Sequence, residues 1–375
     1  MALLHLALRA GLQVRAATVD HGLRPEAAAE AAWVGRVCAE LGVPHQVLHW
    51  QWDGSGNLQD AARRGRRAVL ADWAGAGSLV ALAHTRDDVA EGFILRLARG
   101  AGVDGLAAMT SRWHEGGVGW ARPVLGFSRS ELRLFLREIG RDWIEDPSND
   151  NQRFDRVRVR KALAVLAPLG IDTERLAEVA GHLAEARAAL EAATEVVWGR
   201  VVQDRAVALV LDRDTLAAEP AEIQRRLLVR VILRIARADY GPRGAAVQGL
   251  LARLLAGKDG VLAGCRFQAV KGKLWAFREG RAVAGLVAGP GTSWDGQWRV
   301  EGDWPEGTEV RALGQGLAHC GDWRALGLPR AALMAGPALW QGDRLIAAPL
   351  VGYNPTYSAI SLSPAAALHQ LPDTH

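Results

Sequence analysis

The fold is decided by residues 79–105, which read LVALAHTRDDVAEGFILRLARGAGVDG. The first five residues, Leu79 to Ala83, form an unbroken apolar run of the kind found in strands that are buried on both faces. The next stretch, from Asp87 to Arg99, is predicted to be a helix. A buried strand that leads directly into a helix is the repeating unit of parallel sheets covered by helices, so this segment predicts an α/β fold.

The residues before this segment continue the same alternation. Strands are expected at Gln13 to Val19 and at Val43 to His49. Helices are expected at Met1 to Ala10, from Pro25 to Leu41, and from Asn57 to about Trp73. Together these elements predict a parallel sheet with helices on both sides.

After the α/β segment the predicted secondary structure becomes mainly helical and then mainly β. Ser128 and Glu131 form a capping box before one more helix, and a long helix from Leu176 to Val202 carries alternating charges that favour a solvated face. After Gly257 short strands with glycine turns follow, including a hairpin at Lys271-Gly272-Lys273. Three domains are therefore expected: an α/β catalytic domain at 1–165, a helical linker region at 166–245 and a small β-rich domain at 246–375.

Composition limits the classes of protein that fit. The chain has 375 residues, of which 49% are hydrophobic and 23% charged, as in globular proteins of two or three domains. Its formal charge is +4, and nearly all basic residues are arginines, which suit phosphate contacts but also arise in arginine-rich genomes. Cys38, Cys265 and Cys320 form no C-x-x-C pair, so no zinc site or disulfide framework is indicated. No apolar run is long enough to span a membrane, and we expect a cytoplasmic protein without a membrane partner.

Polar residues stand where the first predicted strand ends. Asp20, His21 and Arg24 follow the strand at Gln13 to Val19. In open α/β sheets, ligands bind beyond the carboxyl ends of the strands. These side chains are therefore candidates for a binding site, although a turn before the helix at Pro25 would also explain them.

A second polar group follows the apolar run at Leu79 to Ala83. Asp87 and Asp88 fall in the first turn of the predicted helix, where the helix dipole favours acids, and this structural reading explains either acid alone. It explains His84 less well. Asp88 and Glu91 are three residues apart, so both carboxylates lie along one helix face. Beside a histidine they could hold a metal ion or a cationic substrate.

Two further segments suggest contacts with anions. The glycine-containing segment RLARGAGVDG (96–105) resembles a helix end followed by a tight loop that could hold phosphates, although capping of the helix end is the default reading. The basic run RVRVRK (156–161) reads either as a strand with one basic face or as the start of a helix. So dense a set of cations is typical of a site for an anionic partner, and a solvated charged surface is the alternative.

Five segments, taken in order, resemble the tRNA(Ile)-lysidine synthetases of bacteria. They are VDHGLR (19–24), NLQDAARRGRRAVL (57–70), LAHTRDDVAEGFILRLARGAGVDGLAAM (82–109), RPVLGFSRSELRLFL (122–136) and WIEDPSNDNQRFDRVRVRKAL (143–163). The segment GVLAGCRFQAVKGKLWAFREGR (260–281) resembles the C-terminal hairpin region of that family. The resemblance is dense up to residue 165 and places the chain among the PP-loop ATP pyrophosphatases.

The resemblance implies an ATP-dependent modification of tRNA(Ile) with a CAU anticodon. ATP adenylates the C2 carbonyl oxygen of the wobble cytidine and releases pyrophosphate. The side-chain amine of lysine then attacks C2 and displaces AMP, which gives lysidine. This chemistry requires a phosphate cradle with Mg²⁺, an acidic pocket for lysine and a basic surface for tRNA. The resemblance leaves open whether the protein forms a homodimer.

The resemblance also implies a role for each candidate residue. Asp88 and Glu91 would bind lysine or a metal ion with His84 and Asp87 beside them, and Asp87 and Asp88 are the candidate Mg²⁺ ligands. The expected nucleotide- and substrate-binding residues are Asp20, His21, Arg24, Arg99, Gly100, Asp146 and Asn149. The expected tRNA-binding residues are Arg156, Arg158, Arg160 and Lys161.

The sequence departs from the family pattern in three places. Val89 and Gly92 stand where the pattern has Gln and Thr, and Val157 stands where it has Asn. The family also begins its catalytic domain with a strand and the loop S-G-G-x-D-S, and the residues after that loop resemble the MALLHLA at Met1. The 375 residues are therefore expected to lack the phosphate loop and the first strand, with a gap or an exposed edge in the sheet and no release of pyrophosphate from ATP.

Three hypotheses account for this pattern. The first is a lysidine synthetase whose true start lies upstream of Met1. The second is an inactive remnant that still binds tRNA. The third is a related PP-loop enzyme such as a tRNA thiolase, although thiolases of the cytidine-modifying type resemble iron–sulfur proteins with C-x-x-C pairs.

Overall fold

The chain divides into two compact units, Met1–Arg187 and Ala188–Thr374. Our computed structural model describes residues 1–22, 26–52, 54, 58–144, 155–238 and 240–362. The first unit carries every candidate site residue that lies in these ranges. The proposed three-part division at 165 and 245 stays a prediction.

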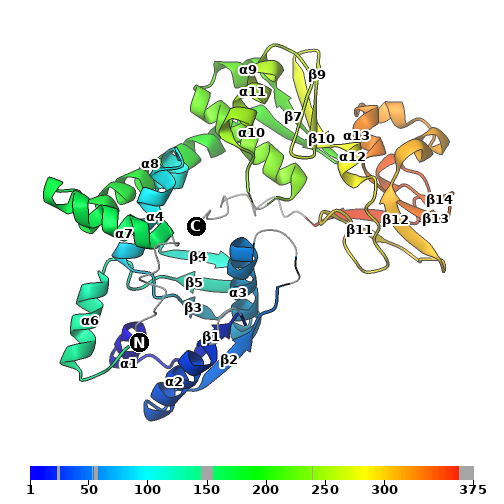
Figure 1. Ribbon diagram of the computed structural model, residues 1–375. Coiled ribbons are helices and arrows are strands. Elements are labelled where there is room, and N and C mark those ends of the chain that lie inside the picture. Colours follow the sequence, from blue (N-terminus) through cyan, green and yellow to red (C-terminus); the bar gives the residue numbers. More distant parts are fainter. Residues whose placement is uncertain (23–25, 53, 55–57, 145–154, 239, 363–375) are drawn as a thin grey trace. The chain divides into compact units, whose positions relative to one another are not determined.

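The first unit is an alternation of helices and short strands (Figure 1). Its elements are α1 (Ala2–Arg9), β1 (Ala16–Asp20), α2 (Ala27–Glu40), β2 (His45–His49), α3 (Leu58–Ala74), β3 (Leu79–Ala81), α4 (Arg86–Leu97), α5 (Val103–Leu106), β4 (Arg112–Glu115), β5 (Val118–Ala121), α6 (Arg129–Glu138), α7 (Asp155–Leu166) and α8 (Thr173–Val201).

The described strands of this unit form two sheets. β1 and β2 pair in parallel, from Ala16 opposite His45 to Asp20 opposite His49. β3 pairs in parallel with β5, which pairs with β4 in the antiparallel direction. Helix α3 packs against β1, β2 and β3, and its Leu70 shares one core with strand residues of both sheets (Figure 1). Where one parallel sheet was expected, the described strands thus form two.

A second core joins α4, α7 and α8. It contains Val89 and Phe93 from α4, Val159 from α7 and Leu176 from α8. The basic run RVRVRK is therefore helical, which settles the choice between strand and helix. Val157, 6% exposed, is also buried, so Val89 and Val157 place apolar side chains inside the protein where the family pattern has polar ones.

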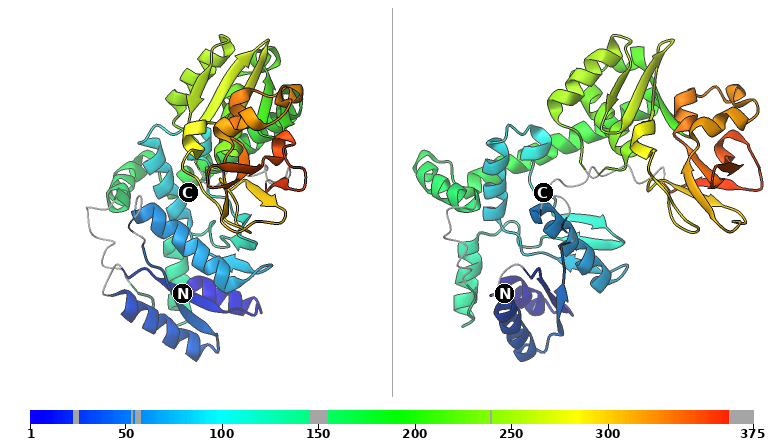
Figure 2. Two further views of the ribbon diagram at one scale, coloured as in Figure 1. Left: turned by 90° about the vertical axis from the view of Figure 1, so that its right-hand side faces the viewer. Right: turned by 45° about the vertical axis from the view of Figure 1, so that its right-hand side comes forward.

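The second unit is dominated by an antiparallel sheet in the order β6-β7-β10-β9-β8. Helices α10 and α11 pack against β8, β9 and β10, and Figure 2 shows both helices beside this sheet. The bounds are β6 (Val202–Arg205), β7 (Ala208–Asp212), α9 (Arg213–Ala218), α10 (Ala221–Ala236), α11 (Gly244–Leu255), β8 (Gly260–Leu262), β9 (Cys265–Val270) and β10 (Lys273–Arg278). The predicted hairpin is present, with Lys271 and Gly272 at φ of 48° and 77°.

The last part of this unit is built from short strands around buried tryptophans. Its elements are α12 (Gly280–Val283), β11 (Trp298–Glu301), β12 (Thr308–Ala312), α13 (Arg330–Met334), β13 (Pro337–Gln341), β14 (Arg344–Ala347) and β15 (Ser358–Ser361). β12, β13 and β14 form one sheet, while β11 pairs with β15. Trp294 and Trp298 lie in the core beside them. The expected β-rich C-terminal region is confirmed.

The charged face of α8 differs from the expectation. Glu191 and Glu195 on this helix form ion pairs with Arg226 and Arg230 on α10, and these two arginines are buried. The charges therefore hold two helices together instead of facing only solvent. Among the helices within the described ranges, none is long and apolar enough to cross a membrane.

Candidate functional site

The start of helix α4 carries the predicted acidic group. Asp88 is part of the helix cap, because its Oδ2 accepts hydrogen bonds from the backbone N–H and the hydroxyl of Thr85, both at 2.8 Å. Those two bonds use only one carboxylate oxygen. The other oxygen, Oδ1, takes no part in the cap and is available for a different partner. Asp88 can therefore cap the helix through Oδ2 and serve a binding site through Oδ1.

Arg129, the first residue of α6, joins the two acids of α4. Its Nη2 lies 2.7 Å from Asp88 Oδ1, and its Nη1 lies 2.7 Å from Glu91 Oε1. Its backbone N–H also donates to Asp87 Oδ2 at 2.8 Å. One feature of the sequence points to a role for this residue. A cation in the first turn of a helix is disfavoured by the helix dipole, so Arg129 requires an acidic partner from elsewhere.

Helix α7 brings two more arginines to the same acids. Arg160 Nε donates to Glu91 Oε1 at 2.7 Å, and Arg156 Nη1 lies 3.6 Å from Asp88 Oδ1. Glu91 is only 1% exposed, and its Oε2 has no hydrogen-bond partner among the described residues. The acidic pair and the basic run, 65 or more residues apart in sequence, thus form one site.

The charges of this site stabilise one another. Burial alone would raise the pKa of Asp88, but Arg129, the Thr85 hydrogen bonds and Arg156 together lower it. Burial would lower the pKa of Arg129, and its bonds to Glu91 and Asp88 raise it instead. Asp88 and Arg129 therefore remain ionised at neutral pH.

His84 lies beside this site in an uncharged form. Burial, with a contribution from Arg122, lowers its pKa to about 4. Arg122 Nε donates to His84 Nδ1 at 3.3 Å, which requires that Nδ1 carry no proton. The guanidinium of Arg122 is held in turn by the Thr110 carbonyl and by the ring of Trp113, 4.2 Å away. His84 therefore adds no positive charge to the acids near it.

A second polar group lies at the carboxyl end of β1. Asp20 Oδ1 accepts a hydrogen bond from the Gly22 N–H at 2.8 Å, and the ring of His21 meets the ring of Trp50 edge-on at 5.6 Å. His21 Nδ1 is buried with no hydrogen-bond partner among the described residues. Trp50 lies directly on Gly65 of α3, where an added Cβ would come within 1.8 Å of the indole nitrogen.

Comparison with known proteins places these features in a family. The PP-loop domain family matches residues 1–166. The tRNA(Ile)-lysidine synthase of Ruegeria pomeroyi is 46% identical over 360 residues, which cover 94% of this chain and 86% of that protein. The chain belongs to the tRNA(Ile)-lysidine synthase family. A second family member, from Zymomonas mobilis, is 37% identical over 74% of this chain and 84% of its own length.

The family assignment confirms the predicted resemblance and the PP-loop fold class. Among solved structures, the U34-tRNA thiolase NcsA from Methanococcus maripaludis with its [4Fe-4S] cluster gives a TM-score of 0.41 at 16% identity. It covers 49% of this chain and 68% of that one. So low a score supports no functional argument. Cys38, Cys265 and Cys320 are all free and buried.

The other predicted residues of this lysidine synthase family member that lie within the described ranges follow α4 or belong to α7. Arg99 is exposed and 3.7 Å from Asp155 Oδ2, while Gly100 follows α4 with a φ of 70°. Arg158 is exposed and also pairs with Asp155, and Lys161 is exposed. Arg24, Asp146 and Asn149 lie outside the described residues.

The candidate metal ligands of this family member are already engaged. Both carboxylate oxygens of Asp88 and one of Asp87 take part in hydrogen bonds. Within the described ranges, no three His, Cys, Asp or Glu side chains gather in a way that could hold a metal ion. Asp87 and Asp88 in this arrangement therefore do not fit a Mg²⁺ site, and we assign no reaction step to a metal ion held by them.

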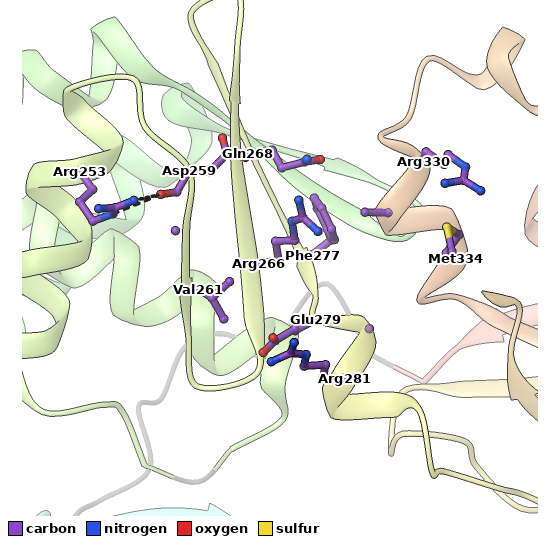
Figure 3. Close-up of a pocket in the computed structure, with 13 residues that line it drawn as sticks. Arg253, Asp259, Val261, Arg266, Gln268, Phe277, Glu279, Arg281, Arg330 and Met334 are labelled. Carbon is purple, nitrogen blue, oxygen red and sulfur yellow. Dashed lines mark hydrogen bonds between the residues drawn. The ribbon is translucent and has the colours of Figure 1, made fainter. Parts of the chain in front are cut away.

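The second unit contains a separate pocket of about 910 Å³ (Figure 3). Arg253, Arg266 and Arg281 line it together with Asp259 and Glu279. Figure 3 shows Glu279 and Arg281 close together at one end, and Arg253 bonded to the Asp259 backbone carbonyl at the other. Its lining therefore mixes both signs of charge, and none of the sequence predictions for the site falls on it.

Proposed function

We propose that this chain attaches lysine to C2 of the wobble cytidine of a tRNA(Ile) with a CAU anticodon, through a cytidine that ATP has adenylated. The observation that carries the proposal is the buried acid pair of Asp88 and Glu91, in a chain 46% identical along 94% of its length to a lysidine synthase. The acid pair keeps one acceptor for an N–H donor of the substrate, because the buried Glu91 Oε2 has no hydrogen-bond partner among the described residues and buried polar atoms are normally hydrogen-bonded.

Two bonds form and two break in this reaction. The C2 carbonyl oxygen of cytidine bonds to the α-phosphorus of ATP, and pyrophosphate leaves. The lysine side-chain amine then bonds to C2, AMP leaves with the oxygen, and the amine loses a proton. The neutral form of His84, whose pKa is about 4, keeps a positive charge away from the attacking amine. An added cation there would oppose the charge that develops on the nitrogen.

The end of β1 is the proposed position of the nucleotide. Asp20 and His21 lie where ligands of α/β sheets bind, and His21 Nδ1 offers a buried nitrogen without a partner among the described residues. The rings of His21 and Trp50 add an aromatic surface for a base. Magnesium would enter as the complex of ATP, with no ligand assigned on this chain.

The exposed part of α7 is the proposed contact for tRNA. Arg158 and Lys161 are exposed on the helix whose Arg156 and Arg160 contact the acids. Arginine and lysine on such a surface bind phosphates and release counterions, which makes affinity dependent on salt. The same helix would thus connect RNA binding to the lysine site.

Incorporation of radiolabelled lysine into a tRNA(Ile) transcript tests the proposal. The protein is produced from its own gene, and ATP is supplied. Glu91→Gln should reduce incorporation by about 100-fold or more, since it removes a buried charge from the site. The matched control is Glu40→Gln, an exposed residue that pairs with Arg141 on the surface.

The incorporation assay has three possible outcomes. Loss of incorporation in the Glu91 variant with full activity in the Glu40 variant supports the proposal. Equal activity of both variants would remove Glu91 from the site. Binding of tRNA by the wild-type protein without any incorporation would favour the inactive tRNA-binding alternative.

A further inference from the structure

His84 and Arg122 follow two neighbouring strands of one sheet. His84 lies between the end of β3 and the start of α4, and Arg122 is the first residue after β5. β3 and β5 run in parallel, with Ala81 opposite Ala121. Because ligands of α/β sheets bind beyond the carboxyl ends of parallel strands, the two side chains lie at the edge where a substrate is expected.

The contact between these side chains fixes where the imidazole carries its proton. A guanidinium has only hydrogen-bond donors, so the Nε–H of Arg122 cannot accept. It lies 3.3 Å from His84 Nδ1, which must therefore be the acceptor. A neutral imidazole has one N–H, and in this arrangement it is at Nε2. The guanidinium thus selects one of the two neutral forms of the ring.

The position of Arg122 is set by the sheet. Arg122 is 7% exposed, its Nη1 donates to the Thr110 carbonyl, and its guanidinium lies over the Trp113 ring. Trp113 on β4 in turn stacks on Trp120 of β5, with ring centroids 5.6 Å apart and planes 12° from parallel. The orientation of the imidazole therefore depends on a guanidinium that has little freedom to move.

The remaining N–H of His84 is available to a ligand. His84 Nε2 has no hydrogen-bond partner among the described residues, yet it is not one of the fully buried polar atoms. The charged groups around the ring are Arg122, Arg66 on α3, Arg156 on α7 and Asp88 on α4. An uncharged donor of fixed direction thus lies beside the acid pair of the site.

The chemistry of the transfer identifies the acceptor. C2 of the cytidine has to come within bonding distance of the lysine amine, so the base must lie next to the acids and to His84. The ring nitrogen N3 is bonded to C2 and accepts hydrogen bonds in cytidine, whereas in uridine the same atom carries a proton. When the amine attacks C2, electron density moves onto N3, and a donor there stabilises it. An uncharged donor also suits a neutral base better than a phosphate, which arginine binds more strongly.

We propose that the Nε2–H of His84 donates to N3 of the wobble cytidine and so distinguishes cytidine from uridine, with Arg122 as the residue that positions it. In uridine two N–H groups would face each other, and neither would have an acceptor. His84 contacts the reacting base in this account, whereas Arg122 acts only through His84. The inference rests on the proposed transfer of lysine to cytidine and adds the group that recognises the base.

Binding of an altered tRNA tests the contact at a single atom. Transcripts of tRNA(Ile) with cytidine or 3-deazacytidine at the wobble position compete for the full chain, with lysine present and ATP absent. The second base has a C–H in place of N3. The wild-type protein should prefer cytidine by at least about fivefold, the size of one hydrogen bond. The preference should disappear in His84→Asn and persist in the matched control His114→Asn, which changes an exposed residue of β4.

Two substitutions of His84 separate the roles of its ring nitrogens. The side-chain amide of asparagine reaches the position of Nδ1, and that of glutamine reaches the position of Nε2. His84→Asn should therefore lower kcat/KM for the cytidine transcript by about tenfold or more, and His84→Gln should lower it less. The KM values for ATP and lysine should change little in either variant. Equal losses in the two variants would overturn the assignment of Nε2 as the donor.

The 15N spectrum of the imidazole tests the role of Arg122. Labelled histidine gives separate signals for protonated and unprotonated ring nitrogens, and His84→Asn identifies the signals of His84. In the wild-type protein at neutral pH we expect a proton on Nε2 and none on Nδ1, and a proton on Nδ1 would contradict the proposal. Arg122→Met should give a mixture of the two neutral forms. An unchanged spectrum in that variant would remove Arg122 from the positioning role.

The outcomes separate this inference from the proposed function. If the protein makes lysidine but binds the cytidine and 3-deazacytidine transcripts equally, only the recognition of the base by His84 is wrong. If the protein makes no lysidine, the proposed function is overturned. A preference for cytidine that His84→Asn removes would then still support the contact with N3.

Discussion

Replacement of Arg129 by methionine would remove the cation that joins Asp88 and Glu91. Both carboxylates are buried, with 12% and 1% of their side chains exposed, and each would lose a 2.7 Å charge-assisted hydrogen bond. Removal of one partner from a buried ion pair costs about 3–5 kcal/mol. Arg129 itself is 31% exposed and Arg160 still contacts Glu91, so we expect a smaller loss, about 2 kcal/mol at neutral pH.

This loss should be local to the start of α4. A chain with two compact units need not unfold in one step, so a single melting temperature would not isolate the effect. Hydrogen exchange of the α4 amides measures the free energy of local opening instead. We expect faster exchange in peptides that contain Asp88 and Glu91, and little change in peptides from the second unit.

A double-mutant cycle tests whether the loss of stability in Arg129→Met comes from the carboxylates that it leaves unpaired. Glu91→Gln removes one of the two charges that Arg129→Met leaves unpaired, so the double variant should lose at least about 1 kcal/mol less than the sum of the single variants. The reasoning about this charge cluster is wrong if the losses in the free energy of local opening of the two single variants simply add in the double variant. It is also wrong if Arg129→Met lowers the free energy of local opening of α4 by less than about 0.5 kcal/mol.

Three further predictions concern other parts of the first unit. The pKa of His84 is lowered to about 4 in the folded chain, so the contribution of the neutral imidazole to stability is complete above its ordinary pKa of 6.5 and is lost as the pH falls from about 6.5 to about 4. His84→Asn should therefore flatten the pH dependence of hydrogen exchange at the α4 amides. Gly65→Ala should displace Trp50 from His21 and raise the KM for ATP severalfold with an unchanged KM for lysine, and equal effects on both substrates would count against a nucleotide site at β1. The double variant Arg158→Gln and Lys161→Gln should weaken tRNA binding and reduce the slope of log K against log salt by about 1–2, and an unchanged slope would remove both side chains from the RNA surface.

The elements of this fold could be predicted where the signals are local. The capping box is present as expected, with Glu131 N donating to the Ser128 hydroxyl and Ser128 N donating to Glu131. The hairpin at Lys271 and Gly272 follows from a turn that requires positive φ at both residues. Such patterns depend on a few neighbouring residues, so they can be read without knowledge of the rest of the chain.

The site could be predicted only in part, because it is assembled from distant segments. The placement of Asp88 and Glu91 on one face of α4 follows from their spacing. Their contact with Arg129 spans 41 and 38 residues. The position of Arg129 in the first turn of a helix indicates that it needs an acidic partner, but the sequence does not indicate which acids provide it. The helical state of α7 was also beyond local pattern, since Val157 and Val159 alternate with arginines as in a strand. The packing of Val159 against α4 and α8 favours the helix over the strand.

The central claim concerns the product of the reaction, and nucleoside mass spectrometry of the tRNA tests it most directly. A tRNA(Ile) transcript with cytidine at the wobble position is incubated with the protein, ATP and lysine, then digested to nucleosides. The account predicts a nucleoside with the mass of cytidine plus lysine minus water, and none from a transcript with uridine at that position. Unmodified cytidine with the active protein, or lysine on the uridine transcript, would contradict it.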